Sequence, residues 1–143
     1  MKMTAGLGTA ALTAGMLLGL PATSAQAADY PTTPGIHVPY GATYTLGTAT
    51  WYNRSVTLDG EHRAISSSGC RATSMTTYDA NGQLLGSNRT GVICNRTAGF
   101  TLNVRADVPG GADRIEVCLT DGNYARLACK PYYRDLAPSA RGN

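Results

Sequence analysis

The stretch from Phe100 to Cys129 constrains the fold of this chain more than any other. Between residues 100 and 108, apolar residues alternate with polar ones, and this period of two is typical of a strand with one buried and one solvated face. Pro109-Gly110-Gly111 then ends the run, because proline cannot donate to a strand ladder and glycine readily adopts turn dihedrals. A second run, apolar at 115, 117 and 119, turns at residues 121–124 into a third strand. The stretch therefore predicts antiparallel strands joined by short turns.

The rest of the chain after residue 27 has the same strand-like character. No segment in it longer than about ten residues shows the 3.6-residue apolar repeat of a helix. Asn81-Gly82 separates two strand-like runs, which is a strong hairpin signal, and we read Asp59-Gly60 as another turn. About seven short strands predict an all-β fold, a small antiparallel two-sheet sandwich, with a small closed β-barrel as the alternative. The strand-like runs in this part are Ala42–Leu58, 61–65, 70–78 and 83–90.

The passage between the two alternating runs bears a resemblance to known domains. Residues 108–113 read V-P-G-G-A-D and lead into I-E-V-C-L at Ile115–Leu119. This passage resembles the crossing between sheets in immunoglobulin-like and fibronectin-like domains. The resemblance implies an immunoglobulin-like sandwich and no particular activity, because one fold serves many functions.

Both ends of the chain are expected to lie outside the sandwich. Lys2 precedes an uncharged run of small and apolar residues about 16 long, shorter than the roughly 20 that span a bilayer. Ala25-Gln26-Ala27 then has the small-x-small pattern of a signal-peptidase site, so we expect a secreted product with no membrane segment after cleavage. The expected organisation is a secretory signal peptide (1–27), an extended Pro-rich N-terminal arm (28–41), a β-sandwich domain (42–134) and a disordered tail (135–143).

Four cysteines are expected to form two disulfides, because the chain is small and carries an export signal. A metal site is not expected, since no two cysteines form a C-x-x-C pair and the chain has only two histidines. Cys118 and Cys129 lie equally far from the centre of their predicted hairpin, and Cys70 and Cys94 lie equally far from Gly82. Opposed strand positions are within disulfide reach. We therefore predict the pairs Cys70–Cys94 and Cys118–Cys129.

Charge and composition argue against nucleic-acid binding. The chain carries 12 Lys+Arg and 9 Asp+Glu, a net charge of +3, and its basic residues are scattered singly. Nucleic-acid binding requires a clustered basic surface, so we do not expect it. Lysine is nearly absent while arginine, alanine, glycine and threonine abound, which suggests a GC-rich genome and a bacterial source.

No catalytic signature emerges from the residues that carry chemistry. His62 is expected on a surface loop and His37 in the N-terminal arm, and no serine stands in a G-x-S-x-G turn. Most carboxylates fall in predicted turns, where aspartate accepts hydrogen bonds from nearby backbone N–H groups. We therefore expect no catalytic residues, no metal and no cofactor, and a chain that is not an enzyme.

The aromatic residues point to binding instead. The chain has eight tyrosines against one phenylalanine and one tryptophan, and tyrosine suits both protein interfaces and sugar stacking. We expect a secreted binding protein whose partner is a protein or a cell-surface polysaccharide. The alternative is an inhibitor of an extracellular protease or amylase that presents the hairpin tip Gly122–Arg126, pre-organised by a disulfide. The candidate binding residues are Trp51, Tyr52, Tyr124, Arg126, Tyr132 and Tyr133.

Overall fold

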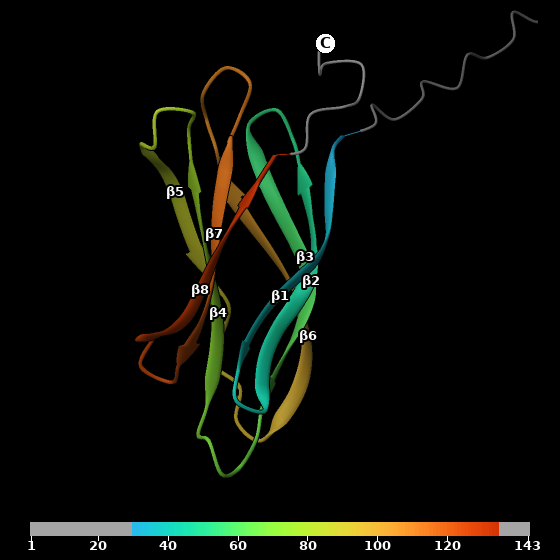
Figure 1. The fold of residues 1–143 in the computed structure, drawn as a ribbon, viewed down its shortest axis with the longest axis vertical. Helices are drawn as coiled ribbons and strands as arrows, with labels where there is room; N and C mark the ends of the chain where they lie inside the picture. The colour runs from blue at the N-terminus through green and yellow to red at the C-terminus, as the bar shows by residue number, and fades with distance from the viewer. Residues whose placement is uncertain (1–29, 135–143) are drawn as a thin grey trace, which may run out of the picture.

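Residues 30–134, which the computed structural model describes, form two antiparallel sheets packed as a sandwich (Figure 1). The strands are β1 (Thr32–Tyr40), β2 (Thr43–Trp51), β3 (Ser55–Ala64), β4 (Arg71–Tyr78), β5 (Leu84–Arg89), β6 (Arg96–Arg105), β7 (Arg114–Asp121) and β8 (Arg126–Tyr133). One four-stranded sheet has the order β1-β2-β3-β6, and the other has the order β5-β4-β7-β8. The predicted hairpin at Asn81-Gly82 joins β4 to β5.

The all-β, two-sheet prediction is confirmed, and the closed-barrel alternative is wrong. Each sheet ends in edge strands, β1 and β6 in one and β5 and β8 in the other, so neither sheet closes on itself. Both predicted disulfides are present, with Cα separations of 4.2 Å for Cys70–Cys94 and 4.1 Å for Cys118–Cys129. The expected signal peptide at 1–27 and tail at 135–143 fall outside the described residues.

The segment expected as an N-terminal arm contains a strand of the first sheet. β1 pairs with β2, with a register shift between Thr33 and Ile36. Prolines suggested an arm, but an edge strand tolerates proline because one side of its backbone has no ladder partner. Pro34 and Gly35 fall within the register shift, where Gly35 takes a φ of 73°. The sandwich therefore begins at Thr32 rather than at residue 42.

The run expected as one strand over Ala42–Leu58 is a hairpin, and the turn expected at Asp59-Gly60 lies inside a strand. The chain reverses after β2, where the Tyr52 N–H donates to the Ser55 carbonyl at 2.9 Å. Asn53, a common turn residue, is the sequence signal for this reversal. β3 then continues without a break through Asp59 and Gly60. Here the glycine of the Asp-Gly pair serves the close approach of β3 to its neighbour β2 and does not form a turn.

The apolar core lies between the sheets and follows the alternation of the strands. In β7, Ile115, Val117 and Leu119 are fully buried. Trp51 is fully buried too, and its indole N–H donates to Thr33 Oγ1 at 2.9 Å, so this candidate binding residue belongs to the core. Truncating a buried side chain of this size typically costs about 3–5 kcal/mol. The buried apolar cluster comprises Ile36, Val38, Ala49, Trp51, Val56, Leu58, Met75, Leu102, Val104, Ala106, Ala112, Ile115, Val117 and Leu119.

Polar side chains occupy another part of the interior. His62 is 2% exposed and lies in β3, so the expectation of a surface loop is wrong. Its Nδ1 lies 3.1 Å from Thr73 Oγ1, which also contacts Thr45 Oγ1. Arg71 is buried as well, and its guanidinium donates to Thr43 Oγ1 and to two backbone carbonyls. Every buried side-chain polar atom in residues 30–134 has a hydrogen-bond partner, which is why the fold tolerates this cluster.

Side chains bridge the two sheets along both lateral edges. On one side, the Tyr132 hydroxyl of β8 accepts a hydrogen bond from the His37 N–H of β1 and donates one to the His37 carbonyl. On the other side, the Asn88 amide of β5 donates to the Asn103 carbonyl of β6 at 3.0 Å. These bonds occupy backbone groups that an edge strand otherwise leaves open to pairing with another chain. Tyr132, a candidate binding residue, thus holds the sandwich together.

Two glycines allow β2 and β3 to approach closely in the middle of their sheet. Gly47 and Gly60 are direct partners in the strand register. A Cβ added to Gly60 would overlap the Leu46 carbonyl oxygen, and one added to Gly47 would overlap the Asp59 carbonyl oxygen. Only a residue without a side chain permits this approach of backbone to backbone.

Gly60→Ala is expected to destabilise the protein by about 3 kcal/mol or more, because the added methyl group must displace the backbone of β2. Gly99→Ala is the matched control: it lies in the neighbouring strand β6, and its Cβ would meet only the Gly60 carbonyl oxygen, at 3.7 Å. We expect that control to change the free energy of unfolding by less than about 1 kcal/mol. Urea unfolding measures both, and equal stability of the two variants would contradict the close-approach argument.

Candidate functional site

The outer face of the β5-β4-β7-β8 sheet gathers arginine and tyrosine side chains. The strand registers align its outward residues in rows across the four strands. The first row is Leu84, Tyr78, Arg114 and Tyr133, the second is Ser87, Thr76, Glu116 and Pro131, and the third is Arg89, Ser74, Cys118 and Cys129. We call this surface the arginine–tyrosine face and define it by Tyr78, Leu84, Arg89, Arg114, Tyr124, Arg126 and Tyr133.

Two arginines of this face lie over tyrosine rings. Arg89 Cζ is 3.5 Å from the ring centroid of Tyr124, and Arg114 Cζ is 4.0 Å from that of Tyr78. A guanidinium over a ring gains cation–π attraction, while the N–H groups in its own plane remain suited to binding a carboxylate or phosphate. Neither arginine forms an ion pair with a residue in the described part of the chain. Their positive charges are therefore held in place without a counter-ion from residues 30–134.

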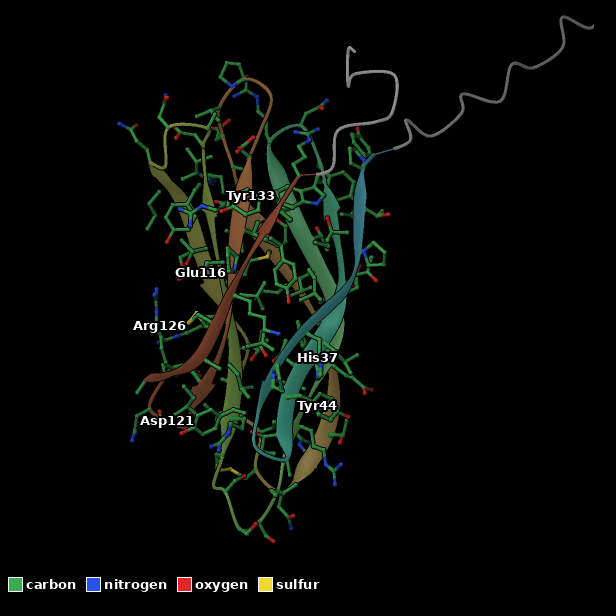
Figure 2. All side chains as sticks on the ribbon, viewed as in Figure 1. His37, Tyr44, Glu116, Asp121, Arg126 and Tyr133 are labelled. Carbon is green, nitrogen blue, oxygen red and sulfur yellow. A yellow bond between two sulfur atoms is a disulfide. The ribbon has the colours of Figure 1, made fainter. Side chains whose placement is uncertain are left out.

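A third arginine pairs with the one carboxylate of the three rows. Arg126 Nη1 lies 2.9 Å from Glu116 Oε1. The Arg126 side chain is 60% exposed, and such a pair contributes at most about 1 kcal/mol, so its main effect is to orient both groups. Figure 2 shows Tyr133, Glu116 and Arg126 along one sheet, with His37 and Tyr44 on the other. The three rows and the hairpin strand thus carry three arginines, of which only Arg126 has a carboxylate partner among residues 30–134.

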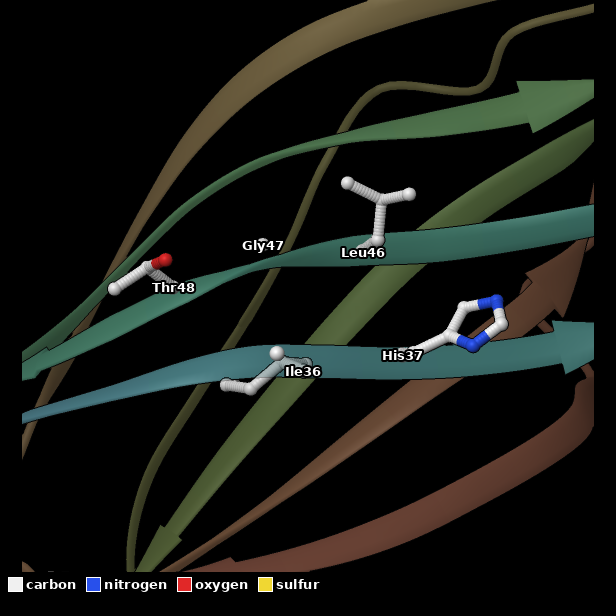
Figure 3. Close-up of a pocket in the computed structure, with 6 residues that line it drawn as sticks. Ile36, His37, Leu46, Gly47 and Thr48 are labelled. Carbon is white, nitrogen blue, oxygen red and sulfur yellow. The ribbon is translucent and has the colours of Figure 1, made fainter.

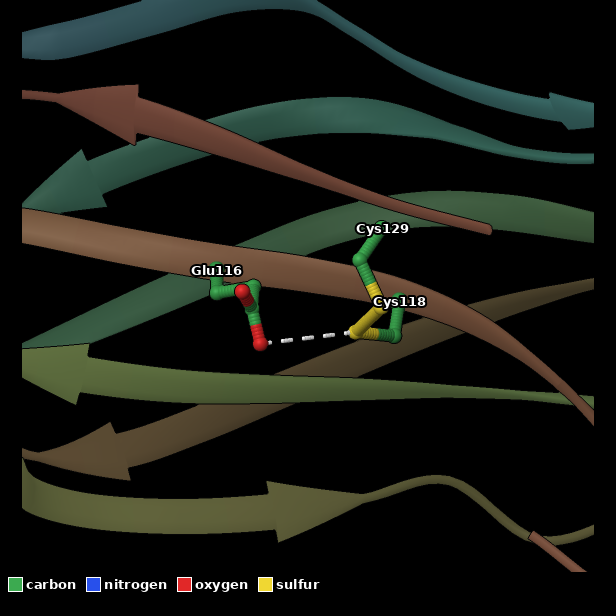
Figure 4. Close-up of side chains that lie close together, drawn as sticks. All are labelled: Glu116, Cys118 and Cys129. Carbon is green, nitrogen blue, oxygen red and sulfur yellow. Dashed lines mark hydrogen bonds between the residues drawn. A yellow bond between two sulfur atoms is a disulfide. The ribbon is translucent and has the colours of Figure 1, made fainter. Parts of the chain in front are cut away.

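The Cys118–Cys129 disulfide joins β7 to β8 beneath this ion pair. The two cysteines are direct partners in the strand register, and Glu116 Oε1 lies 3.8 Å from Cys118 Sγ (Figure 4). The carboxylate and both sulfurs are close enough together to contact one metal ion. Sulfurs joined in a disulfide offer no thiolate, however, so we assign no metal to this group. The disulfide instead fixes the hairpin that carries Tyr124 and Arg126.

The tip of this hairpin is a compact turn that folds back toward β5. Asp121 Oδ1 accepts hydrogen bonds from the Asn123 and Ala125 N–H groups at 2.8 and 2.9 Å. Tyr124 takes a φ of 65°, and its hydroxyl donates to the Thr90 carbonyl at 3.4 Å. The Tyr124 ring therefore packs against Arg89 instead of projecting from the tip.

Two of the depressions on the described surface differ in chemistry. One, of about 390 Å³, is on the arginine–tyrosine face and has hydroxyl, amide, phenol and guanidinium groups. The other, of about 430 Å³, follows β1 and β2, and its lining is mostly apolar (Figure 3). The first is lined by Ser74, Ser87, Asn88, Arg89, Thr120 and Tyr124, and the second by Gly35, Ile36, His37, Leu46, Gly47 and Thr48. The polar depression is the better candidate site, because its lining combines hydrogen-bonding groups with a cation.

The structure separates the six candidate binding residues into two groups. Tyr124, Arg126 and Tyr133 belong to the arginine–tyrosine face, and Tyr133 is 61% exposed. The other three lie elsewhere: Trp51 in the core, Tyr132 between the sheets, and Tyr52 against Tyr30 with ring centroids 4.7 Å apart.

Sequence reasoning missed four residues of this face: Tyr78, Leu84, Arg89 and Arg114. Their signal was cross-strand register rather than any local motif. In the pairing of β4 with β5, Leu84 lies opposite Tyr78, but only because the register shifts between Thr77 and Tyr78. Arg114 then falls on the other side of Tyr78 when β7 is paired with β4. Charges that are scattered singly along the chain are thus neighbours on the sheet.

His62, which was expected on a surface loop, is enclosed between the sheets. Its ring packs on Phe100, with centroids 4.9 Å apart, and it is 2% exposed. Burial, reinforced by the positive charge of Arg96, lowers the pKa of His62 below its usual value of 6.5. The ring is therefore neutral in the folded protein at neutral pH, and its role is structural.

The buried ring makes stability depend on pH. Below about pH 6.5 the unfolded chain binds a proton at position 62 that the folded chain resists, so stability is full above that pH and falls as pH decreases. The slope from this group is at most about 1.4 kcal/mol per pH unit. His62→Gln is expected to lose less stability than wild type between pH 7.5 and pH 5.0 in urea unfolding. His37→Gln, at an exposed position, is the control, and an equal loss in all three proteins would contradict this account.

Comparisons of this chain with protein-family models, with curated proteins and with solved structures found no match. The chemistry of the arginine–tyrosine face therefore has to be inferred from its own side chains. No helix within residues 30–134 is long and apolar enough to cross a bilayer.

Proposed function

We propose that this chain is a secreted, non-catalytic binding protein that contacts its partner through the arginine–tyrosine face. The observation that carries the proposal is the pair of guanidinium groups held over tyrosine rings. Beside them, Leu84 and Tyr133 are 63% and 61% exposed and add apolar contact area. Arginine and tyrosine are enriched where proteins bind, and side chains already held in place lose less entropy on binding.

The outer face of the other sheet supports this choice by contrast. Its polar side chains bond to one another: the Thr101 hydroxyl donates to Asp59 at 2.6 Å, and the Asn103 amide donates to Thr57 at 2.7 Å. Groups paired in this way have less capacity left for a partner.

The strand order supports an immunoglobulin-like assignment. With β2, β3 and β6 as strands A, B and E, and β4, β7 and β8 as C, F and G, the two sheets have the A-B-E and C-F-G orders of that fold. β5 then lies beside C, where variable-type domains carry strand C′. Secretion is supported by two disulfides in a small chain and by the signal-like N-terminus, and a bacterial source rests on composition alone.

The alternative, an inhibitor that presents the hairpin tip Gly122–Arg126 to an extracellular hydrolase, has less support. Tyr124 packs on Arg89 and bonds to the Thr90 carbonyl, so the tip does not offer its one aromatic ring to a cleft. The proposal of a non-catalytic protein is supported by the enclosure of His62 between the sheets.

Photo-crosslinking from position 133 tests the proposal. Benzoylphenylalanine replaces Tyr133 in one variant and Arg63, an exposed residue on the outer face of the other sheet, in the control. Each protein is incubated with cell envelopes and culture supernatant of the source organism and then irradiated. We expect adducts from position 133 and none from position 63.

A second substitution checks that the adduct depends on the charge of this face. Arg114→Gln in the position-133 variant is expected to reduce adduct yield about tenfold or more, because a hydrogen bond from a charged group contributes roughly 1.5–3 kcal/mol. Adducts formed only from position 63, or a yield that Arg114→Gln leaves unchanged, would contradict the proposal. An adduct with a protein or with a polysaccharide identifies the class of partner.

A further inference from the structure

We infer that the polar depression on the arginine–tyrosine face binds the acid group of a sugar unit in an extracellular polysaccharide. The acid group is a carboxylate or a phosphate, since both accept hydrogen bonds from a guanidinium fork in the same way. The inference rests on the proposed function, because it names what the face binds.

Arg89 provides the charge and the geometry for such a group. Its guanidinium is 3.5 Å from the Tyr124 ring centroid and has no carboxylate partner among residues 30–134. Stacking restricts the fork to one plane, so less side-chain entropy is lost when the fork binds an anion. The Tyr124 ring is itself held by its hydrogen bond to Thr90. The cation is thus pre-organised at the edge of the depression.

The rest of the lining suits the hydroxyl groups of a sugar. Ser74 and Ser87 contribute hydroxyl oxygens, whereas the hydroxyl of Thr120, which is buried, donates to backbone carbonyls instead. No aliphatic side chain lines the depression. Ser87 Oγ lies 3.2 Å from Thr76 Oγ1, but a hydroxyl has one donor and two acceptor positions, so capacity for a ligand remains. A volume of about 390 Å³ is near the lower end for ligand pockets, which suits one small unit.

A second cation on the same face favours a polymer over a single sugar. Arg114 lies two rows from Arg89, which corresponds to about 13 Å along the strands. It stacks on Tyr78 as Arg89 stacks on Tyr124. One extended chain that repeats an acidic unit can therefore reach both forks, and Tyr133, in the same row as Arg114, adds an exposed ring for stacking on a sugar.

Calorimetric titration with defined probes tests the inference. The probes are a galacturonic acid trimer, a neutral galactose trimer, glycerol phosphate and a glutamate tripeptide. We expect the acidic trimer or glycerol phosphate to bind at least about tenfold more tightly than the neutral trimer, because a fork–anion pair adds roughly 1.5–3 kcal/mol. The peptide offers carboxylates without the hydroxyl groups of a sugar, so we expect it to bind more weakly than the preferred anionic probe. The stronger of the two anionic probes distinguishes a carboxylated from a phosphorylated polymer.

Substitutions assign the binding to this depression. Arg89→Gln is expected to weaken the preferred anionic probe about 10- to 100-fold, and Arg89→Lys, which keeps the charge without the fork, to fall between that variant and wild type. Arg63→Gln, a charge loss on the other sheet, is the matched control and is expected to leave affinity within about twofold of wild type. Amide NMR spectra confirm that each variant is folded.

The outcomes that overturn the inference leave the proposed function separately testable. Absence of binding by both anionic probes, tighter binding of the peptide, or an equal loss in Arg63→Gln and Arg89→Gln each overturns the sugar site. If crosslinks from position 133 persist in any of those cases, the binding face stands and only its ligand is wrong. If the crosslinks are absent as well, both conclusions fail.

Discussion

The burial of every second residue from Ile115 to Leu119 on β7, a central strand of its sheet, is the constraint on which the rest of the structure depends. Ile115, Val117 and Leu119 face the other sheet and are excluded from water, which stabilises the fold through the hydrophobic effect. The same alternation turns Arg114 and Glu116 to the outer side. Fixing the inward residues therefore also fixes which side chains meet in rows on the arginine–tyrosine face.

Local patterns in the sequence predicted much of this architecture. The alternation after Phe100, the Asn81-Gly82 turn and the symmetric placement of the cysteines are all short-range signals, and the two-sheet fold and both disulfides followed from them. The turn predicted at Asp59-Gly60 was wrong because Gly60 is needed for close approach to Gly47, a residue on another strand. A turn at Gly60 would have broken the alternation of β3. Because β3 is continuous, His62 lies an even number of residues from Leu58 and therefore faces the core as Leu58 does.

The candidate site was less predictable, because its residues become neighbours only through the register in which the strands pair. Tyr124, Arg126 and Tyr133 were singled out as aromatic or charged residues near a hairpin, whereas Arg89 and Tyr78 had no distinguishing neighbours in the sequence. Pairing of β4 with β5 and with β7 is what brings their rows together. Register depends on the sum of many contacts across strands, and a one-residue slip turns each side chain to the opposite face. Trp51 shows the converse. It is an aromatic residue near a turn, but its position in the alternation of β2 points its side chain into the core.

The separation of inward and outward positions on the same strands has a consequence for engineering. A substitution at Ser74, Ser87 or Arg89 changes the chemistry of the surface while the buried apolar cluster keeps its composition. A laboratory library restricted to these outward positions therefore varies the surface and leaves the core intact. The two disulfides add stability, which offsets small losses that such substitutions cause.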